Sequence, residues 1–183
     1  MATIPLSSAS RQPDWQNRTE VKKGNLAEQI VDAYLQTSGD FVPYAPICEG
    51  RHPFDRLVAS RDKRKVFIAD CKAKARRNYY PDTGIDVRHY QEYKEIAERY
   101  HMDAFLFFVD EKQRAIYGNF LSELEKPAKI TVGRYIHNYP KREGRIIYFP
   151  LAHMVEVAKL TEGQAKELER LSTRRYDYNL IPF

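Results

Sequence analysis

The sequence predicts an α/β fold in which a central mixed β-sheet is flanked by helices. Three observations lead to this prediction. Segments with helical and strand periodicity follow one another in the order helix, three strands, helix, strand and strand. The continuous apolar run 104–109 has the length and aromatic content of a fully buried central strand. Segments 54–59 and 66–72 are apolar runs separated by a basic turn, which predicts a hairpin.

The elements before the hairpin are one helix and one strand. The helix is predicted to begin at Asn25, a good N-cap residue, and to end in the run 38–40, which is Ser-Gly-Asp. Residues 41–48 are predicted to form the first strand. Pro43 and Pro46 indicate an edge strand or a broken strand, because proline has no N–H to donate to a central ladder.

The second half of the predicted core is a loop, a helix and two strands. Loop 73–84 is basic and aromatic and ends in turn-forming residues. An amphipathic helix is predicted at 86–100, with Tyr93 on its inner side. The two strands are the buried run 104–109 and the segment 114–119. Because helices and strands alternate here, both faces of the sheet should be covered.

The pattern changes after residue 120. Segments 130–137 and 145–149 predict a second hairpin. Thr161 and Gln164 have the spacing of a capping box, so a last helix should start there and run to about Ser172. The chain is therefore expected to have three parts: a flexible N-terminal arm at 1–20, a core at 21–120, and a C-terminal hairpin and helix at 121–183 packed on the core.

The composition favours a polyanionic partner. The formal net charge is +5, and the thirteen tyrosines include candidates for stacking on bases. No stretch approaches the roughly 20 apolar residues that span a bilayer, and the first residues have no apolar signal core. The sequence thus predicts a soluble, cytoplasmic protein. Cys48 and Cys71 lie in apolar segments without metal-ligand spacing and are predicted to be buried thiols.

The segment 66–72 ends in Asp70-Cys71-Lys72. Because side chains alternate along a strand, Asp70 and Lys72 are expected on one face. Desolvating a carboxylate and an ammonium together is costly, and a divalent metal ion is one reason to do so. Asp55 belongs to the preceding strand and would join Asp70 if the ends of the two strands bend or splay. This pattern predicts a paired carboxylate site beside a lysine.

At Glu28, Asp55, Asp70 and Lys72 the chain resembles the PD-(D/E)xK nuclease superfamily, which includes restriction endonucleases and Holliday junction resolvases. The pattern of that superfamily is an acid on a helix, an acid that opens a strand, and Asp/Glu-x-Lys on the next strand. The resemblance covers residues 21–120. It implies a restriction-endonuclease-like core and a metal-dependent endonuclease that hydrolyses DNA, with Mg²⁺ as cofactor and Mn²⁺ as a substitute.

The resemblance also implies a role for each site residue. Asp55, Asp70 and the Cys71 carbonyl would bind Mg²⁺, and Glu28 would hold a water ligand or a second ion. Lys72 would orient the attacking water and steady the charge that develops on the phosphate. The loop that follows is predicted to track the nucleic-acid backbone and to stack bases through Lys74, Arg76, Arg77, Tyr79 and Tyr80.

Two rival motifs are weaker predictions. In the first, Asp82 is followed by Glu92-x-Lys94, which spells the superfamily signature. That stretch is strongly helical, and residues two apart on a helix do not face each other. The second is Asp110-Glu111-Lys112, which is expected to be a solvated turn.

Two other functions stay open. The same fold without turnover would be a nucleic-acid-binding module. A plain salt bridge between Asp70 and Lys72 would suit a structural or assembly protein. The acids distinguish a nuclease from a binder, because a pure phosphate binder gains nothing from carboxylates aimed at the backbone. The oligomeric state is also open, and a homodimer is compatible with the sequence.

Overall fold

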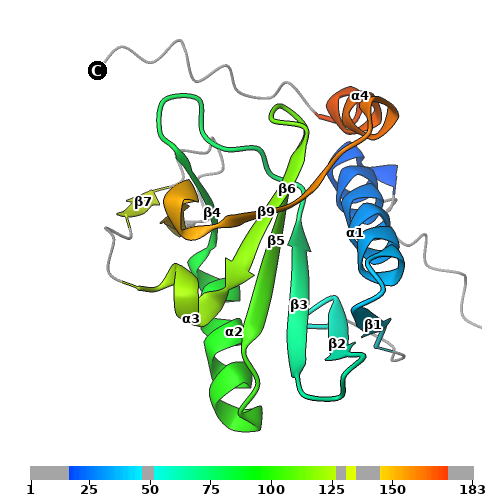
Figure 1. The fold of residues 1–183 in the computed structure, drawn as a ribbon. Coiled ribbons are helices and arrows are strands. Elements are labelled where there is room, and N and C mark those ends of the chain that lie inside the picture. Colours follow the sequence, from blue (N-terminus) through cyan, green and yellow to red (C-terminus); the bar gives the residue numbers. More distant parts are fainter. Residues whose placement is uncertain (1–16, 47–51, 127–130, 135–144, 173–183) are drawn as a thin grey trace, which may run out of the picture.

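The computed structural model describes residues 17–46, 52–126, 131–134 and 145–172. Among these residues the main sheet has six strands (Figure 1). In spatial order they are β1 (Phe41–Tyr44), β2 (Arg56–Ser60), β3 (Val66–Lys72), β5 (Ala104–Asp110), β6 (Ala115–Phe120) and β9 (Val155–Lys159).

The main sheet is mixed, as the sequence predicts. β1, β2 and β3 are antiparallel neighbours, and β5 then pairs with β3 in parallel, with Asp70 opposite Leu106. β6 and β9 continue the sheet in antiparallel fashion. β1 lies at the edge, as its proline at position 43 predicts, and the 104–109 run is confirmed as a buried internal strand. The predicted strand ended at Cys48, which lies outside the described residues.

A second sheet of three strands is formed by β4 (Asp82–Asp86), β8 (Arg145–Pro150) and β7 (Thr131–Arg134). The predicted C-terminal hairpin is confirmed as the β7–β8 pair, and its connection at 135–144 lies outside the described residues. The predicted loop 73–84 is wrong at its end, where β4 pairs with β8. Gly84 suggested a turn, but it allows close pairing instead, since a Cβ there would lie 2.4 Å from the Ile147 carbonyl oxygen.

Helix α1 (Thr19–Thr37) covers one face of the main sheet, with α4 (Glu162–Arg170) beside it (Figure 1). The start predicted at Asn25 is wrong, because α1 begins six residues earlier. Lys23 stabilises this first part of the helix through an ion pair with Glu111, at 2.8 Å. The start of α4 is confirmed: Thr161 and Gln164 make the reciprocal hydrogen bonds of a capping box.

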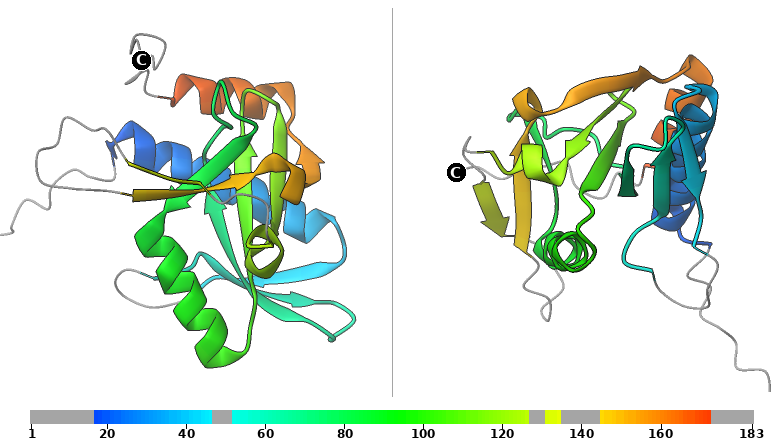
Figure 2. Two further views of the ribbon diagram at one scale, coloured as in Figure 1. Left: turned by 90° about the vertical axis from the view of Figure 1, so that its left-hand side faces the viewer. Right: turned by 60° about the horizontal axis from the view of Figure 1, so that its bottom comes forward.

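The other face of the main sheet is covered by α2 (Val87–Tyr100), the second sheet and the short helix α3 (Leu121–Leu124). Figure 2 shows α2 and the second sheet on the side opposite α1. Asp86 caps α2 by accepting a hydrogen bond from the Arg88 N–H, and Tyr93 is buried on the inner side of the helix, as predicted. β9 was not predicted; it follows the 3₁₀ turn Leu151–His153 and joins β6. In the part of the chain that the structure describes, no helix has the length and apolar character to cross a membrane.

Candidate active site

Asp70 and Lys72 lie on the face of β3 that is turned toward α2. Phe67 and Ala69 pack on the α1 side and Ile68 on the α2 side, so the alternation along β3 places both motif residues with Ile68. Asp70 is only 5% exposed, and its Oδ2 lies 2.6 Å from Lys72 Nζ. The predicted pairing of acid and lysine on one face is therefore confirmed.

Tyr93 of α2 completes this side of the motif. Its ring centroid lies 5.8 Å from Lys72 Nζ, and its hydroxyl lies near the Asp70 carboxylate. Burial, followed by the nearby negative charge of Asp70, raises the pKa of Tyr93 far above its ordinary value. Tyr93 thus stays protonated beside Asp70.

Asp55 reaches the same site from the position directly before β2. The chain bends over 53–55, so Asp55 leaves the ladder just before Arg56, which pairs with Ala69. The backbone N–H of Asp55 still donates to the Ala69 carbonyl at 3.1 Å. Its carboxylate Oδ2 accepts a hydrogen bond of 2.7 Å from the Cys71 N–H. This splayed strand end is the condition under which the sequence expected Asp55 and Asp70 to meet.

Glu28 enters the site from α1, and two residues that the sequence analysis missed accompany it. Asp32 lies one helical turn after Glu28 and accepts two hydrogen bonds from Arg56, at 2.8 and 2.6 Å. The same guanidinium lies 3.6 Å from Glu28 Oε2. The i, i+4 spacing of the two acids and the position of Arg56 beside Asp55 were the sequence signals for this cluster.

The carboxylates of the cluster are incompletely neutralised. Burial, with a further contribution from Asp55, raises the pKa of Glu28 to about 7. Burial also raises the pKa of Asp70 to about 6, although the nearby Lys72 ammonium lowers it. When all groups are ionised, four carboxylates face two cations, a difference of two negative charges. The four carboxylates belong to Glu28, Asp32, Asp55 and Asp70, and the cations to Arg56 and Lys72.

The donor atoms of this cluster fit a hard divalent cation. Within the described ranges, no three His, Cys, Asp or Glu side chains are gathered closely enough to form a ready-made ligand set. Among the same residues, Asp70 Oδ2 is buried without a hydrogen bond of regular geometry, although Lys72 Nζ lies close to it. Carboxylate and carbonyl oxygens suit Mg²⁺ or Mn²⁺. Burial holds the Cys71 thiol protonated by raising its pKa, so the carbonyl oxygen is the donor that Cys71 offers.

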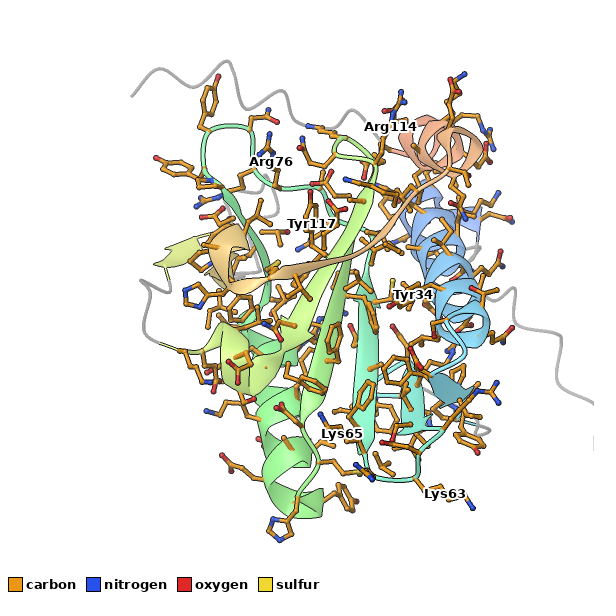
Figure 3. The ribbon with its side chains drawn as sticks, in the orientation of Figure 1. Tyr34, Lys63, Lys65, Arg76, Arg114 and Tyr117 are labelled. Atoms are coloured by element: carbon orange, nitrogen blue, oxygen red, sulfur yellow. The ribbon has the colours of Figure 1, made fainter. Side chains whose placement is uncertain are left out.

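The residues after Lys72 have different environments. Lys74 is not at a solvated strand end: its Nζ donates to the Gly84 carbonyl at 3.0 Å, and burial lowers its pKa to about 8. Arg76 is exposed on the loop at the end of β3 opposite the hairpin turn that carries Lys63 and Lys65 (Figure 3). Arg77 is paired with Asp82 at 2.5 Å. Tyr79 and Tyr80 are exposed.

The structure separates the two rival motifs from this cluster. Glu92 and Lys94 lie on α2, as predicted, and Lys94 pairs with Glu125 at 3.2 Å. The expectation that Asp110 and Glu111 form a solvated turn is wrong, because both side chains are buried. Asp110 accepts three backbone N–H hydrogen bonds, and Glu111 pairs with Lys23 of α1. Asp110 and Glu111 therefore connect the end of β5 to the loop after β3 and to α1.

The structure brings together the three acids that the sequence resemblance singled out. Glu28 on α1, Asp55 directly before β2 and Asp70 on β3 line one pocket, and Lys72 pairs with Asp70. No model of a known protein family matches the sequence, and no curated protein matches it.

The solved structures that are similar to this chain include the following two. One is Hjc of Archaeoglobus fulgidus, described as a Holliday junction resolvase from an archaeal hyperthermophile. It is 13% identical, with a TM-score of 0.48, and the match covers 74% of this chain and 97% of Hjc. The other is D212, described as a nuclease from a fusselovirus. It is 12% identical, with a TM-score of 0.45, and the match covers 93% of this chain and 97% of D212.

Proposed function

We propose that this protein is a metal-dependent endonuclease that hydrolyses phosphodiester bonds in DNA. The observation that carries the proposal is the pocket that Glu28, Asp55 and Asp70 line together, with Lys72 paired to Asp70 and two more carboxylates than cations in the cluster. A plain salt bridge needs one acid and one base. A cluster with two uncompensated negative charges costs folding free energy unless a divalent cation offsets it.

Asp55, Asp70 and the Cys71 carbonyl would hold Mg²⁺, with Mn²⁺ as a substitute, and Glu28 would hold a water ligand or a second ion. The bound ion would act as a Lewis acid on the phosphate and lower the pKa of a bound water. The raised pKa values of Glu28 and Asp70 support this assignment, because a cation at the cluster would relieve the repulsion that contributes to both.

Lys72 would orient the attacking water and stabilise negative charge on the phosphate in the transition state. Its place between Asp70 and the ring of Tyr93 suits this role, since both neighbours limit the motion of the ammonium. Tyr93 is a positioning residue that would hold Asp70 in one orientation. The net charge of +5 and the exposed Arg76 support DNA as the partner.

A catalytically silent DNA-binding or assembly protein is the second candidate. The observation that favours it is the short distance between Lys72 Nζ and Asp70 Oδ2, since in such a protein this contact would be a structural salt bridge. The two candidates differ in what they predict for metal binding and turnover.

The test measures single-turnover DNA cleavage and Mn²⁺ binding for three variants. Asp70→Ala should lose both, because it removes a ligand. Lys72→Ala should retain Mn²⁺ binding but cleave about a hundredfold more slowly, the scale of losing one electrostatic or general-base group. Lys94→Ala is the matched control and should cleave as the wild type does, because Lys94 pairs with Glu125 away from the cluster. Cleavage that persists in EDTA, or that needs Lys94 and not Lys72, contradicts the proposal.

A further inference from the structure

The loop 73–81 leaves β3 directly after Lys72 and is anchored at several points. The Arg76 N–H donates to Asp110 Oδ2 at 2.9 Å, and the Arg77 N–H donates to the Asp82 carbonyl at 2.9 Å. Farther along, the Leu151 N–H of the 3₁₀ turn donates to the Pro81 carbonyl at 2.8 Å. These bonds connect the loop to β5, to β4 and to the segment after β8, so its tip has a defined position relative to the motif.

Arg77 holds the inside of this loop together. Asp82 accepts hydrogen bonds from its Nε at 2.6 Å and from its Nη2 at 2.5 Å. The guanidinium carbon lies 3.8 Å from the ring centroid of Tyr148 on β8 and 4.4 Å from that of Tyr80. The three side chains thus form a layered stack, and the charge of Arg77 is already neutralised. Arg77 is therefore a support for Tyr80 and not a spare cation for a phosphate.

Tyr80 is the outer layer of that stack. Arg77 lies against its ring, yet the residue remains 53% exposed, and the adjacent Tyr79 is 72% exposed. An aromatic ring that is fixed from one side and open to solvent is suited to stacking on a flat ligand. A tyrosine used for packing would instead be covered, as Tyr93 is at 1% exposed.

We infer that Tyr80, on the loop that follows the motif strand and backed by Arg77 and Tyr148, is a stacking platform for an unpaired nucleobase. The inference rests on the proposed function for its ligand, which is DNA, and adds the substrate class: DNA with a single-stranded or unpaired segment. In a duplex each internal base is covered on both sides by its neighbours, so away from the duplex ends only an unpaired base offers a face to Tyr80.

The inference predicts that loss of the Tyr80 ring lowers the affinity for single-stranded DNA without changing the salt dependence of binding. Tyr80→Leu should weaken binding of a single-stranded DNA oligonucleotide on the order of tenfold, the scale of losing one aromatic stack. Binding of a fully paired duplex should change little. The slope of affinity against salt concentration should not change, because no phosphate contact is lost. Tyr80→Phe should bind as the wild type does, because stacking needs the ring and not the hydroxyl.

The measurement is fluorescence anisotropy of labelled single-stranded and duplex oligonucleotides with the full chain in EDTA, which prevents cleavage by the proposed route. Tyr100→Leu is the matched control, because Tyr100 is 57% exposed at the end of α2 and stacks on no other residue in the described part of the chain. Circular dichroism melts check that each variant is folded.

The outcomes separate this inference from the proposed function. Equal loss of single-stranded and duplex binding in Tyr80→Leu, or no loss of either, overturns the platform. Single-strand binding that depends on the Tyr80 ring, without metal-dependent cleavage, supports the platform and contradicts the nuclease. If Tyr80→Leu leaves both the cleavage rate and the affinity for DNA unchanged, the result supports the nuclease and overturns the platform. A protein that binds neither oligonucleotide overturns both.

Discussion

At the scale of single residues, the cluster combines features that a stability-optimised core would avoid. Asp70 is buried with one oxygen poorly bonded, and Glu28 shares its surroundings with three other carboxylates. A buried acid with incomplete neutralisation destabilises the folded state, because its charged form loses hydration without full compensation. Such residues are candidates for function, because the free-energy cost of burying them is offset only when a ligand binds.

Glu28→Gln should stabilise the metal-free protein at alkaline pH. The folded pKa of Glu28, about 7, lies above its ordinary value of 4.5, so stability is lost as pH rises from about 4.5 to about 7. Replacing the acid by its amide removes that loss. The variant should therefore exceed the wild type in urea stability at pH 8 and match it more closely at pH 5. Glu95→Gln, at an exposed acid on α2, is the control and should show no such difference. A lower stability of Glu28→Gln at pH 8 would show that its contact with Arg56 dominates.

Asp32→Asn should weaken Mn²⁺ binding even though Asp32 is not a proposed ligand. Asp32 holds Arg56 bidentately, and without its charge the guanidinium can move the short distance to Glu28. The cluster also loses one of its two excess negative charges. Adding Arg56→Met removes the competing cation and restores the excess to two, so Mn²⁺ affinity should recover in the double variant. Calorimetric titration measures both, and equal affinity in wild type and Asp32→Asn would refute this role.

At the scale of elements, β4 links the motif to the second sheet. Lys74 follows the motif strand and donates to the Gly84 carbonyl, while Gly84 itself lies close against β8. The position of β4 therefore affects the end of β3 and the start of α2, where Asp86 is the cap. β4 therefore supports the site on the side that faces α2.

Gly84→Ala should destabilise the protein by roughly 1–3 kcal/mol, the range for overpacking a close contact. A Cβ at position 84 would lie 2.4 Å from a backbone oxygen of β8, which cannot rotate away. Gly163→Ala is the matched control, because a Cβ there meets nothing within 4 Å and alanine favours the helix. The control should be neutral or slightly stabilising. Urea denaturation monitored by circular dichroism compares the two variants. If both are equally stable, the close contact between Gly84 and β8 does not limit which residue position 84 accepts.

At the scale of the whole molecule, the main sheet separates two cores, and the charged cluster lies where α1, β2 and β3 meet. A cation bound there contacts elements that are far apart in the sequence. Its binding free energy therefore adds to the folding free energy of the entire domain, because the site does not exist in the unfolded chain.

Mn²⁺ or Mg²⁺ should raise the melting temperature of the wild type. At a free ion concentration a hundred times the dissociation constant, the gain is about 2.7 kcal/mol. The gain should be smaller at pH 5 than at pH 8, because Glu28 and Asp70, with pKa values of about 7 and about 6, are protonated at pH 5 and compete with the ion. Thermal unfolding with and without each ion measures the shift. A shift that survives in Asp70→Ala would place the ion elsewhere.

Local patterns were enough to predict several parts of this protein. The alternation in 66–72 placed Asp70 and Lys72 on one face, Pro43 indicated an edge strand, and Thr161 and Gln164 predicted the start of α4. Each depends on residues within a few positions of one another, where periodicity, missing N–H groups and capping bonds act directly.

Only the tertiary structure decided the features that join distant residues. β4 exists because β8 pairs with it from the other end of the chain, which overrides the turn preference of Gly84. Glu111 is buried because Lys23, 88 residues away, neutralises it, and Asp110 because it accepts the N–H of Arg76, 34 residues away. Arg56 lies in the acid cluster because α1 brings Asp32 to it, and Arg77 supports Tyr80 because Tyr148 packs against it. Charge neutralisation and strand pairing act through space, so the sequence supplies the groups and the fold decides which of them meet.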